Sequence, residues 1–595
     1  MAAVLLLAAF ALYGGSLHYP LVFDDVRLAD VAALKAYSAF PPQLQVRWLS
    51  NLSFGWTYAV FGTDWAWHRA LNVVLHAATA AALFGFLARL IEVTIKEAGS
   101  RWFAFYGAML FLLHPVAVYS VAYLGERSII LATLFSLLAL RCVVEGLIRG
   151  STPWFVGAAL GYFFAVSSKE HAAMLPAVAA ALAVLLREQS GASLKKLAVP
   201  AFLFGILGLA LVYQRRSLIG ATYEPFTSDA LAALGGLDPQ NVYPLSVINQ
   251  GWLFFRYLLT WILPWPGWMS IDLRTGLQGQ WIAWPQSAGF VAWLVYPVIA
   301  VLLLRRGGRL GLAGLGLLGP WLLALTEMSV VRVQEPFVLY RSYLWMAVFF
   351  AVLPAVLWRF APRARHAGAA IACALLAAAS LDRIASFSSG EALWDDVVRK
   401  NSGSRASLVE RGYVNRGMAR FDLGQRETAL ADFDQALALN ERYPDAWLGR
   451  ASVYLGTARP ALALADVDRA LALDNRYASA WDKRCAALLA LERVPEARSD
   501  CEHALMLDPR NIDALVNTGA VYHRLGLVSA AQDSYRKALA MDPAHGTANH
   551  NLGVLLLDAG RRDEAVRDHF VKGCRAGIAG SCDILQRSRR QPGSQ

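Results

Sequence analysis

The sequence predicts an all-α protein made of two parts, a polytopic membrane domain followed by a soluble α-solenoid. Apolar segments long enough to cross a bilayer recur as far as about residue 387. After residue 410 the sequence becomes charged and Ala-rich, and small residues recur at a fixed interval, which is typical of helical repeats. We therefore place the membrane domain at 1–387, a connecting helix at 388–409, the repeats at 410–585 and a disordered tail at 586–595.

Composition excludes an ordinary soluble protein. Hydrophobic residues make up 57% of the chain, and its formal net charge is +11. A positive charge can indicate nucleic-acid binding, but here the Arg and Lys residues of the first part lie in short loops between apolar segments. That distribution is a membrane-topology signal, so no nucleic-acid partner is expected.

Eleven apolar segments of about 17 to 25 residues are predicted to span the membrane. The first lacks a positively charged start, so we interpret it as a span and not as a cleaved signal peptide. The eleven segments are 1–19, 66–91, 102–119, 128–147, 153–167, 171–187, 196–213, 285–304, 310–327, 343–359 and 367–386.

Basic residues gather in alternate loops, which the positive-inside rule assigns to the cytoplasm. The amino terminus is then cytoplasmic and the repeats lie outside. The short apolar segment Trp252–Trp265 is interpreted as a re-entrant or interfacial helix, because a further span would move the basic cluster at 305–309 to the outer side. The basic residues are Arg89, Lys96, Arg101, Arg141, Arg149, Arg187, Lys195, Lys196, Arg305, Arg306, Arg309, Arg359, Arg363 and Arg365.

Two adjacent carboxylates, Asp24 and Asp25, follow the first span on the outer side. A charged side chain costs about 2.5 to 3.5 kcal/mol at the centre of a membrane helix, so acids at a membrane edge are either solvated or used. We interpret one of the pair as a catalytic base, which two neighbouring acids favour by raising the pKa of one of them. The alternative is a solvated loop start.

The helix beginning at Trp65 carries His68, Asn72 and His76 on one face, because they are spaced four residues apart. Polar packing against a neighbouring helix is the alternative to a site. The two histidines are roughly 12 Å apart along a helix, too far to share one ion, so no metal is expected.

Further polar residues interrupt apolar segments at their outer ends. His114, Glu126 and Arg127 frame one turn, and Lys169 and Glu170 form another. Basic residues on the outer side run against the positive-inside bias, and an anionic ligand would explain them. Glu126 and Arg127 could also form only a local ion pair.

The soluble part repeats every 34 residues, with small residues where paired helices touch. This is the tetratricopeptide pattern, which predicts a right-handed solenoid that binds extended peptides. Asn415, Asn517 and Asn551 share one repeat position and are candidate peptide-binding residues, unless Asn only belongs to the consensus. One small-residue position is occupied by Gly417, Ala451, Cys485, Gly519 and Gly553, and another by Ala429, Ala463, Ala497, Ala531 and Ala565.

Four cysteines lie in the soluble part. Cys485 and Cys501 fall on the two helices of one repeat, and Cys574 and Cys582 flank a turn. If the repeats lie outside the membrane, both pairs can form disulfides, Cys485–Cys501 and Cys574–Cys582. Zinc bound by four cysteines is less favoured by these spacings.

The ordered set of polar motifs resembles the transmembrane and tetratricopeptide-containing O-mannosyltransferases and their bacterial relatives, members of the GT-C superfamily. The resemblance covers essentially the whole chain. Trp48 departs from it, since relatives have Pro there, and Tyr119 replaces a Glu that relatives place near the site, so the sugar is not carried over. The motifs are Phe23-Asp24-Asp25, Arg47 to Phe54, His68/Asn72/His76, His114-Pro115, Glu126-Arg127-Ser128, Ser168-Lys169-Glu170 and Tyr340 to Leu344.

The resemblance implies an inverting, metal-independent glycosyltransferase without a cofactor, which takes a sugar from a polyprenyl-phosphate donor at the outer membrane face. Asp24 matches the family's base, with Asp25 beside it. The donor phosphate would be held by Arg341, Lys169 and Arg127, with Arg47 near the base and Arg256 beside the isoprenoid. Other residues expected to line the site are His68, Asn72, His114, Glu126, Glu170, Tyr340 and Tyr343.

The acceptor implied is a Ser or Thr hydroxyl of a protein that the repeats recruit. In a bacterium the donor would be an undecaprenyl-phosphate sugar, the membrane the inner membrane, and the repeats periplasmic. Two alternatives stay open: transfer of the sugar to a lipid or glycan, and a non-enzymatic membrane scaffold for a secretion or pilus complex.

Overall fold

The computed structural model describes residues 1–39, 47–95, 101–191, 194–221, 238–277, 280–404, 406 and 408–590. Over these residues the chain is all-helical and contains no strand. It divides into two compact units, residues 1–409 and 410–595. Lys96 of the predicted cytoplasmic loops lies outside the described residues, as does the end of the predicted tail; the last helix continues to Arg590, where a disordered tail is predicted from residue 586.

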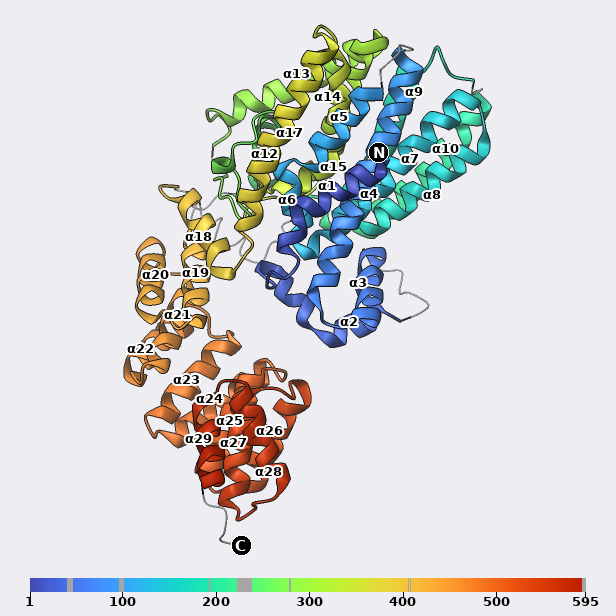
Figure 1. The fold of residues 1–595 in the computed structure, drawn as a ribbon. Helices are drawn as coiled ribbons and strands as arrows, with labels where there is room; N and C mark the ends of the chain where they lie inside the picture. Colours follow the sequence, from blue (N-terminus) through green and yellow to red (C-terminus); the bar gives the residue numbers. More distant parts are fainter. Residues whose placement is uncertain are drawn as a thin grey trace. The chain divides into compact units, whose positions relative to one another are not determined.

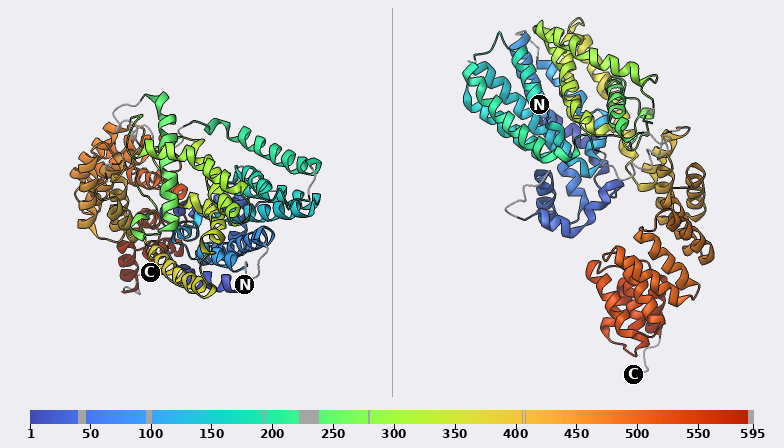
Figure 2. Two further views of the ribbon diagram at one scale, coloured as in Figure 1. Left: turned by 90° about the horizontal axis from the view of Figure 1, so that it is seen from above. Right: turned by 180° about the vertical axis from the view of Figure 1, so that it is seen from behind.

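Unit 1 is a bundle of long helices that run side by side, with short helices at one end (Figures 1 and 2). One core of buried apolar side chains extends through it. The helices are α1 (Ala2–Tyr13), α2 (Val31–Tyr37), α3 (Trp48–Phe61), α4 (Trp65–Ile95), α5 (Arg101–Leu112), α6 (Pro115–Val121), α7 (Arg127–Arg149), α8 (Thr152–Ser168), α9 (Leu175–Leu185), α10 (Leu194–Arg215), α12 (Pro239–Ile262), α13 (Gln286–Arg305), α14 (Gly308–Met328), α15 (Tyr343–Phe349), α16 (Leu353–Leu357), α17 (Pro362–Ala385) and α18 (Gly390–Asn401).

Six helical segments among the described residues are long and apolar enough to cross a membrane. They become seven if α5 and α6, bent by 59° at the break before Pro115, form one broken span. The count is lower than the eleven predicted because several of the predicted segments contain only a shorter apolar helical stretch, Ala2–Ser16, Glu170–Leu185 or Ala201–Gln214. Every one of the eleven is nevertheless helical over most of its length.

The segment predicted as a short re-entrant or interfacial helix is part of a longer helix, which is not among the six candidate spans of the described residues. It belongs to α12, a helix of 24 residues that begins at Pro239 and continues through Pro244. Leu253, Phe254 and Tyr257 are buried in the main core, so the segment packs inside unit 1. The polar residues before Trp252 hide the length of this helix from a hydropathy reading.

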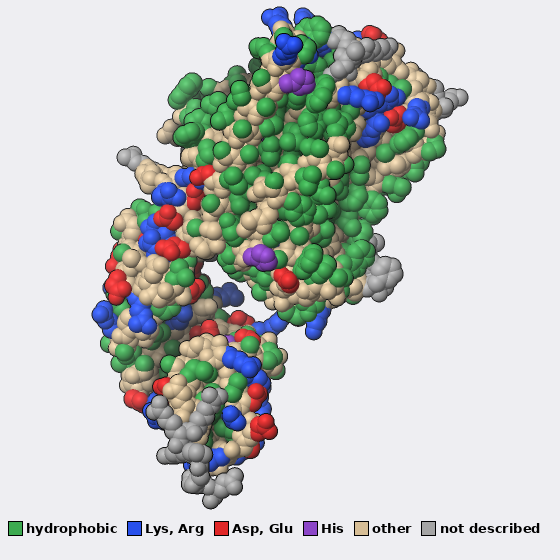
Figure 3. All heavy atoms as spheres, in the orientation of Figure 1, with side chains coloured by type: hydrophobic (Ala, Val, Ile, Leu, Met, Phe, Trp, Pro, Cys, Tyr) green, Lys and Arg blue, Asp and Glu red, His purple; other side chains and the backbone are tan. Residues whose placement is uncertain are grey.

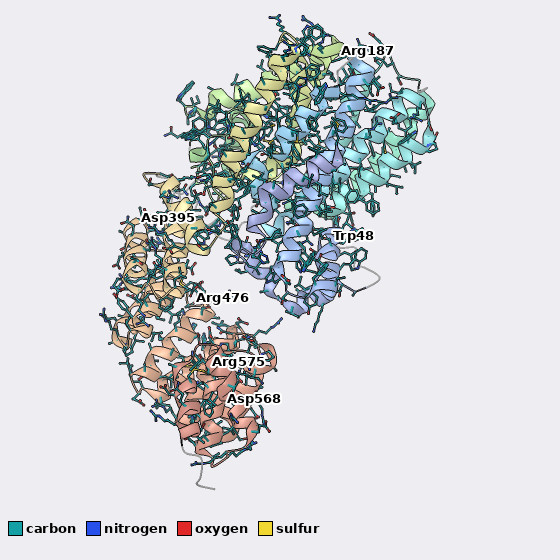
Figure 4. The ribbon with its side chains drawn as sticks, in the orientation of Figure 1. Trp48, Arg187, Asp395, Arg476, Asp568 and Arg575 are labelled. Carbon is teal, nitrogen blue, oxygen red and sulfur yellow. A yellow bond between two sulfur atoms is a disulfide. The ribbon has the colours of Figure 1, made fainter. Side chains whose placement is uncertain are left out.

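The two ends of unit 1 carry different sets of polar residues. The candidate site residues lie at the starts of α4 and α7 and at the end of α14, whereas Arg149 and Arg305 lie at the opposite ends of their helices. Figure 3 shows an apolar flank on this unit with Lys and Arg side chains gathered at one end. In Figure 4, Trp48 and Arg187 mark the two ends.

The described residues of unit 2 form five pairs of successive helices of almost equal length, followed by α29. The predicted small residues lie where the two helices of a pair meet: a Cβ on Gly519 would lie 2.5 Å from the ring of Tyr535, and one on Gly417 would lie 3.0 Å from Phe433. The helices are α19 (Glu410–Asp422), α20 (Arg426–Leu439), α21 (Pro444–Gly456), α22 (Pro460–Leu473), α23 (Ala478–Ala490), α24 (Val494–Leu507), α25 (Ile512–Arg524), α26 (Val528–Met541), α27 (Gly546–Asp558), α28 (Glu564–Arg575) and α29 (Ala579–Arg590).

Candidate functional site

The two adjacent aspartates have opposite environments. They lie in a short 3-10 helix, Phe23–Ala29, after α1. The Asp24 side chain is 47% exposed and lies 3.5 Å from the guanidinium of Arg27, whose side chain is 81% exposed. Asp25 is completely buried. Asp24 is therefore the carboxylate that an incoming hydroxyl can reach, and Asp25 is not.

Asp25 fixes the segment after α1 to the residues that directly precede α7. Its two carboxylate oxygens accept hydrogen bonds from the backbone N–H groups of Leu124 (2.8 Å) and Gly125 (2.6 Å). Burial raises the pKa of Asp25 to about 7, although these hydrogen bonds and the charge of Arg69 lower it. A raised pKa was predicted from the neighbouring acid, but its largest cause is burial, with a smaller contribution from Glu126.

Phe23, directly before Asp24, has a left-handed backbone with φ +57°. This conformation is unfavourable for a bulky L-residue and persists only where its surroundings hold it. The Phe23 ring packs edge-on against Tyr123 at 5.5 Å between centroids and against Trp394 at 5.6 Å. Tyr123 in turn packs against Tyr340 at 6.0 Å, so an aromatic bridge connects the aspartates to the cationic side of the site.

Each residue of the Lys169-Glu170-His171 turn pairs with a different element. Lys169, 2% exposed, forms an ion pair with Glu126 and lies 4.9 Å from the centre of the Tyr340 ring. Glu170 accepts two hydrogen bonds from Arg47, at 2.6 and 3.1 Å. The turn thus joins the starts of α3 and α7 to the segment before α15.

His171 leads to a buried carboxylate, Glu327, near the end of α14. Glu327 is 3% exposed and has three basic neighbours: His171 at 3.0 Å, Arg332 at 3.1 Å and Arg341 at 3.3 Å. Arg341 also donates to the carbonyl of Glu335 at 2.8 Å. Cations surround this carboxylate because an isolated charge would be costly to bury.

Arg127 lies inside the bundle and away from any accessible surface. It is completely buried, its Nε donates to Asn72 Oδ1 at 2.7 Å, and its Nη2 donates to the backbone carbonyl of His68 at 2.9 Å. Its guanidinium also stacks 3.8 Å above the Phe54 ring. Arg127 therefore joins α3, α4 and α7, and neither the predicted phosphate role nor the alternative of a local ion pair with Glu126 matches these contacts.

The other predicted lining residues also have structural partners. His68 Nε2 lies 3.1 Å from the Gly62 carbonyl, and His76 Nδ1 shares a hydrogen bond with the Tyr343 hydroxyl at 2.6 Å. His114 caps α6 through its Nδ1, while its Nε2 lies 3.2 Å from the Trp261 carbonyl. These buried side chains fix helix ends behind the site.

Arg256 on α12 is different from the other predicted cations. It is half-buried, and its guanidinium lies 4.6 Å from the centre of the Phe337 ring. Within the described part of the chain it forms no ion pair. Phe337 belongs to the loop that leads to Arg341, and the Tyr257 hydroxyl accepts a hydrogen bond from Val338 N–H of that loop at 2.8 Å. Arg256 therefore adds a positive charge that no carboxylate among the described residues neutralises.

The three repeat asparagines are engaged within unit 2. Asn415 donates to the carbonyl of Arg411 on its own helix at 2.9 Å, and Asn517 donates to Asp482 of the preceding repeat at 2.8 Å. Asn551 hydrogen bonds with Tyr535. The Asn517 and Asn551 amides contact the preceding repeat and the Asn415 amide contacts its own helix, so the structure does not present all three asparagines as free peptide ligands.

Unit 2 contains two disulfides. Cys485 and Cys501 join α23 to α24 with Cα atoms 5.4 Å apart, and Cys574 and Cys582 join α28 to α29 with Cα atoms 4.8 Å apart. Cys142 and Cys373 are free thiols.

Several site residues were not predicted from the sequence. Arg69 is 4% exposed, and its positive charge lowers the pKa of Asp25. Its guanidinium donates to the Pro20 carbonyl at 2.8 Å. Tyr123, Glu327 and Arg332 were also missed. A signal existed for Glu327, because a lone acid near the end of an apolar helix is costly unless it has partners. Tyr123 had no such signal, since an aromatic residue in an apolar stretch is ordinary.

Comparison with known proteins gives two findings. Residues 414–478 and 522–578 match the tetratricopeptide repeat family. Among curated proteins, the chain is similar to the human protein O-mannosyl-transferase TMTC2, with 30% identity over 138 residues. This match covers 22% of the present chain and 16% of the human protein, so the chain spans about one sixth of the length of that relative.

Two similar solved structures are also tetratricopeptide proteins. TTC0263 from Thermus thermophilus is 25% identical, with a TM-score of 0.27, and the match covers 30% of this chain and 96% of that protein. The first repeat domain of Spaghetti (RPAP3), solved with an HSP90 peptide, is 27% identical, with a TM-score of 0.19, and the match covers 20% of this chain and 93% of that domain.

Proposed function

We propose that this protein is an inverting glycosyltransferase of the GT-C type. It moves a sugar from a polyprenyl-phosphate donor to a Ser or Thr hydroxyl of an acceptor protein that the repeats recruit. The similarity to a protein O-mannosyl-transferase and the tetratricopeptide repeats support this class. Mannose is the first sugar to test, because it is the one in the relative's name.

The proposed topology includes the shorter apolar helices as spans, which gives eleven crossings. The helix ends that carry Arg149 and Arg305 face the cytoplasm of a bacterial inner membrane, and the site and the repeats face the periplasm. The two disulfides of unit 2 support this orientation, since disulfides persist in oxidising compartments.

The observation that carries the proposal is the charge pattern of the site. An accessible carboxylate, Asp24, is connected through Tyr123 and Tyr340 to buried cations, and Arg256 has no carboxylate partner among the described residues. An uncompensated, half-buried guanidinium favours an anion such as the donor phosphate. Lys169, Arg341 and Arg47 already have carboxylate partners that offset their charge, so Arg256 supplies the unbalanced positive charge at the donor phosphate.

In this mechanism the Asp24 carboxylate accepts the proton of the acceptor hydroxyl as the hydroxyl oxygen bonds to the anomeric carbon. The bond between that carbon and the phosphate oxygen breaks, and its electron pair leaves on the phosphate. The guanidinium of Arg256 stabilises the negative charge that develops there. Attack opposite the leaving group inverts the anomeric centre.

The test uses purified protein in liposomes with a tritium-labelled polyprenyl-phosphate mannose donor and cell-envelope proteins as acceptors. Wild type should label protein, and Asp24→Asn should lower the rate by about 10²- to 10⁴-fold while the protein stays folded. Asp64→Asn is the matched control, an exposed acid at the far end of the same predicted outer loop, and should keep full activity.

Three outcomes would contradict the proposal. Label in lipid or glycan but not in protein would support the other acceptor class. Full activity of Asp24→Asn would show that Asp24 is not the catalytic base. No transfer by wild type with mannose, glucose or N-acetylglucosamine donors would favour the scaffold.

A further inference from the structure

The last helix of unit 1, α18, packs against Phe23 at one side of the candidate site and hydrogen bonds to the loop after α12, which in turn contacts the loop that carries Arg341. It follows α17 and directly precedes the chain that enters the repeats at Glu410. We propose that α18 is a positioning element for the transfer reaction, with Trp394 acting on Asp24 through Phe23, and Asn401 acting on the loop that carries Arg341. The inference rests on the proposed function and adds residues outside the donor and acceptor sites.

The position of the proposed base, Asp24, depends on packing around Phe23. Trp394 of α18 is buried, and its ring lies 5.6 Å from that of Phe23. Since Phe23 holds a left-handed backbone at φ +57°, its neighbours must keep it there. Asp24 follows directly in the chain. Loss of the Trp394 ring would let the backbone at Phe23 relax and would move the Asp24 carboxylate.

The position of the loop that carries Arg341 depends, through the loop after α12, on Asn401 at the end of α18. Asn401 is 2% exposed and uses both ends of its amide: Nδ2 donates to the Asp272 carbonyl at 2.8 Å, and Oδ1 accepts from Arg274 N–H at 2.8 Å. The loop after α12 is thereby fixed to α18 by two hydrogen bonds of opposite direction. An aliphatic side chain could replace neither.

Arg274 continues the connection to the site. Its Nη1 donates to the carbonyl of Gln334 at 2.6 Å, and its Nη2 pairs with Asp272 at 2.7 Å. The next residue after Gln334 is Glu335, whose carbonyl accepts a hydrogen bond from Arg341 at 2.8 Å. A continuous path of hydrogen bonds and covalent bonds therefore leads from Asn401 to Arg341.

α18 is itself firmly held. Asp396, 3% exposed, pairs with Arg383 of α17 at 2.8 Å and with Lys400 at 2.7 Å. Both cations also donate to the carbonyl of Met269, at 2.9 and 2.5 Å. With α18 anchored at its middle, its two contacts keep the aspartate segment and the arginine loop at a constant separation, which transfer requires because a misplacement of about 1 Å can cost 10²-fold in rate.

The test compares steady-state kinetics of the full-length protein in liposomes with polyprenyl-phosphate mannose. Trp394→Ala should lower kcat about 10- to 100-fold with the KM for the donor unchanged, and Trp394→Phe should restore most of it. Asn401→Ala should instead raise the donor KM about 10-fold. Arg399→Ala is the control on the same helix, since its side chain is 68% exposed, and should match wild type.

The two variants that define the inference are separable in their effects. Kinetics of Trp394→Ala and Asn401→Ala within twofold of wild type would overturn it. So would an equal loss of kcat and donor affinity in both, accompanied by a lower melting temperature, because that result indicates a general role in folding. If Trp394→Ala does not fold, Trp394→Leu serves, with the same expected fall in kcat. Wild-type turnover tests the proposed function, whereas only the ratio of variant to wild type tests this inference.

Discussion

Replacement of Asp25 by Asn tests whether burial or hydrogen bonding dominates at this carboxylate. Asp25 is completely buried, and its oxygens face two backbone N–H groups. If the charge-assisted hydrogen bonds dominated, the folded protein would favour the ionised form. Burial instead raises the pKa to about 7 from the ordinary value of 3.8, so the folded protein favours the protonated form.

The sign and size of the pH dependence follow from this difference. A group whose pKa is raised by folding contributes stability that is complete below its unfolded pKa and is lost as pH rises through its folded pKa. Each difference of one in pKa corresponds to about 1.4 kcal/mol. Between pH 5 and 7 the wild type should therefore lose roughly 2 kcal/mol of unfolding free energy that Asp25→Asn does not lose. Above about pH 8 the curves should run parallel.

The assay is denaturant unfolding of both proteins in the same detergent at half-unit steps from about pH 5 to 8.5, the range that the linkage relation makes informative. The measured quantity is the difference in unfolding free energy between wild type and Asp25→Asn at each pH. Asp24→Asn is the control, because its exposed carboxylate forms no backbone hydrogen bond among the described contacts. A difference that stays constant or grows with pH in favour of wild type would refute the burial argument.

Two further predictions concern the cations and the disulfide. Arg256→Gln should weaken donor binding about 10-fold or more and leave the melting temperature unchanged, because no carboxylate in the described part of the chain loses a partner. Arg127→Gln should lower the melting temperature and leave donor binding unchanged, since Asn72 would lose a buried hydrogen bond worth about 1–3 kcal/mol. Binding isotherms and melting curves for both variants separate these roles. Cys485→Ser should destabilise unit 2 by about 3 kcal/mol. Denaturant unfolding checks this loss, and equal stability of the oxidised wild type and the variant would contradict it.

The repeats show how far a periodic sequence can be interpreted. A fixed interval of small residues determines which helix faces touch, because only a small side chain fits against Phe433 or Tyr535. The match to the tetratricopeptide family confirms this part of the prediction. Apolar segments likewise predict helices, since backbone polar groups in a bilayer must be satisfied within the segment.

Hydropathy was less informative about which helices cross a membrane. It also underestimated the length of α12, because the polar residues before Trp252 belong to the same helix. Polar residues that precede an apolar stretch can belong to the same helix when neighbouring loops satisfy them. The carbonyl of Pro336, which accepts from Gln250 at 2.8 Å, is such a partner.

The sequence by itself determined the helical class, the repeats and a set of polar residues that had to lie near one another or be unstable. Only the tertiary structure decided which of these side chains is accessible and which is already held in a hydrogen bond or ion pair. Asp24 and Asp25 are adjacent and chemically identical, yet one is exposed and the other buried. Arg127 and Arg256 are both basic, yet of the two only Arg127 donates guanidinium hydrogen bonds to described residues. The reason is physical: solvation and charge neutralisation depend on neighbours brought from distant parts of the chain, and these distances are not encoded in local pattern.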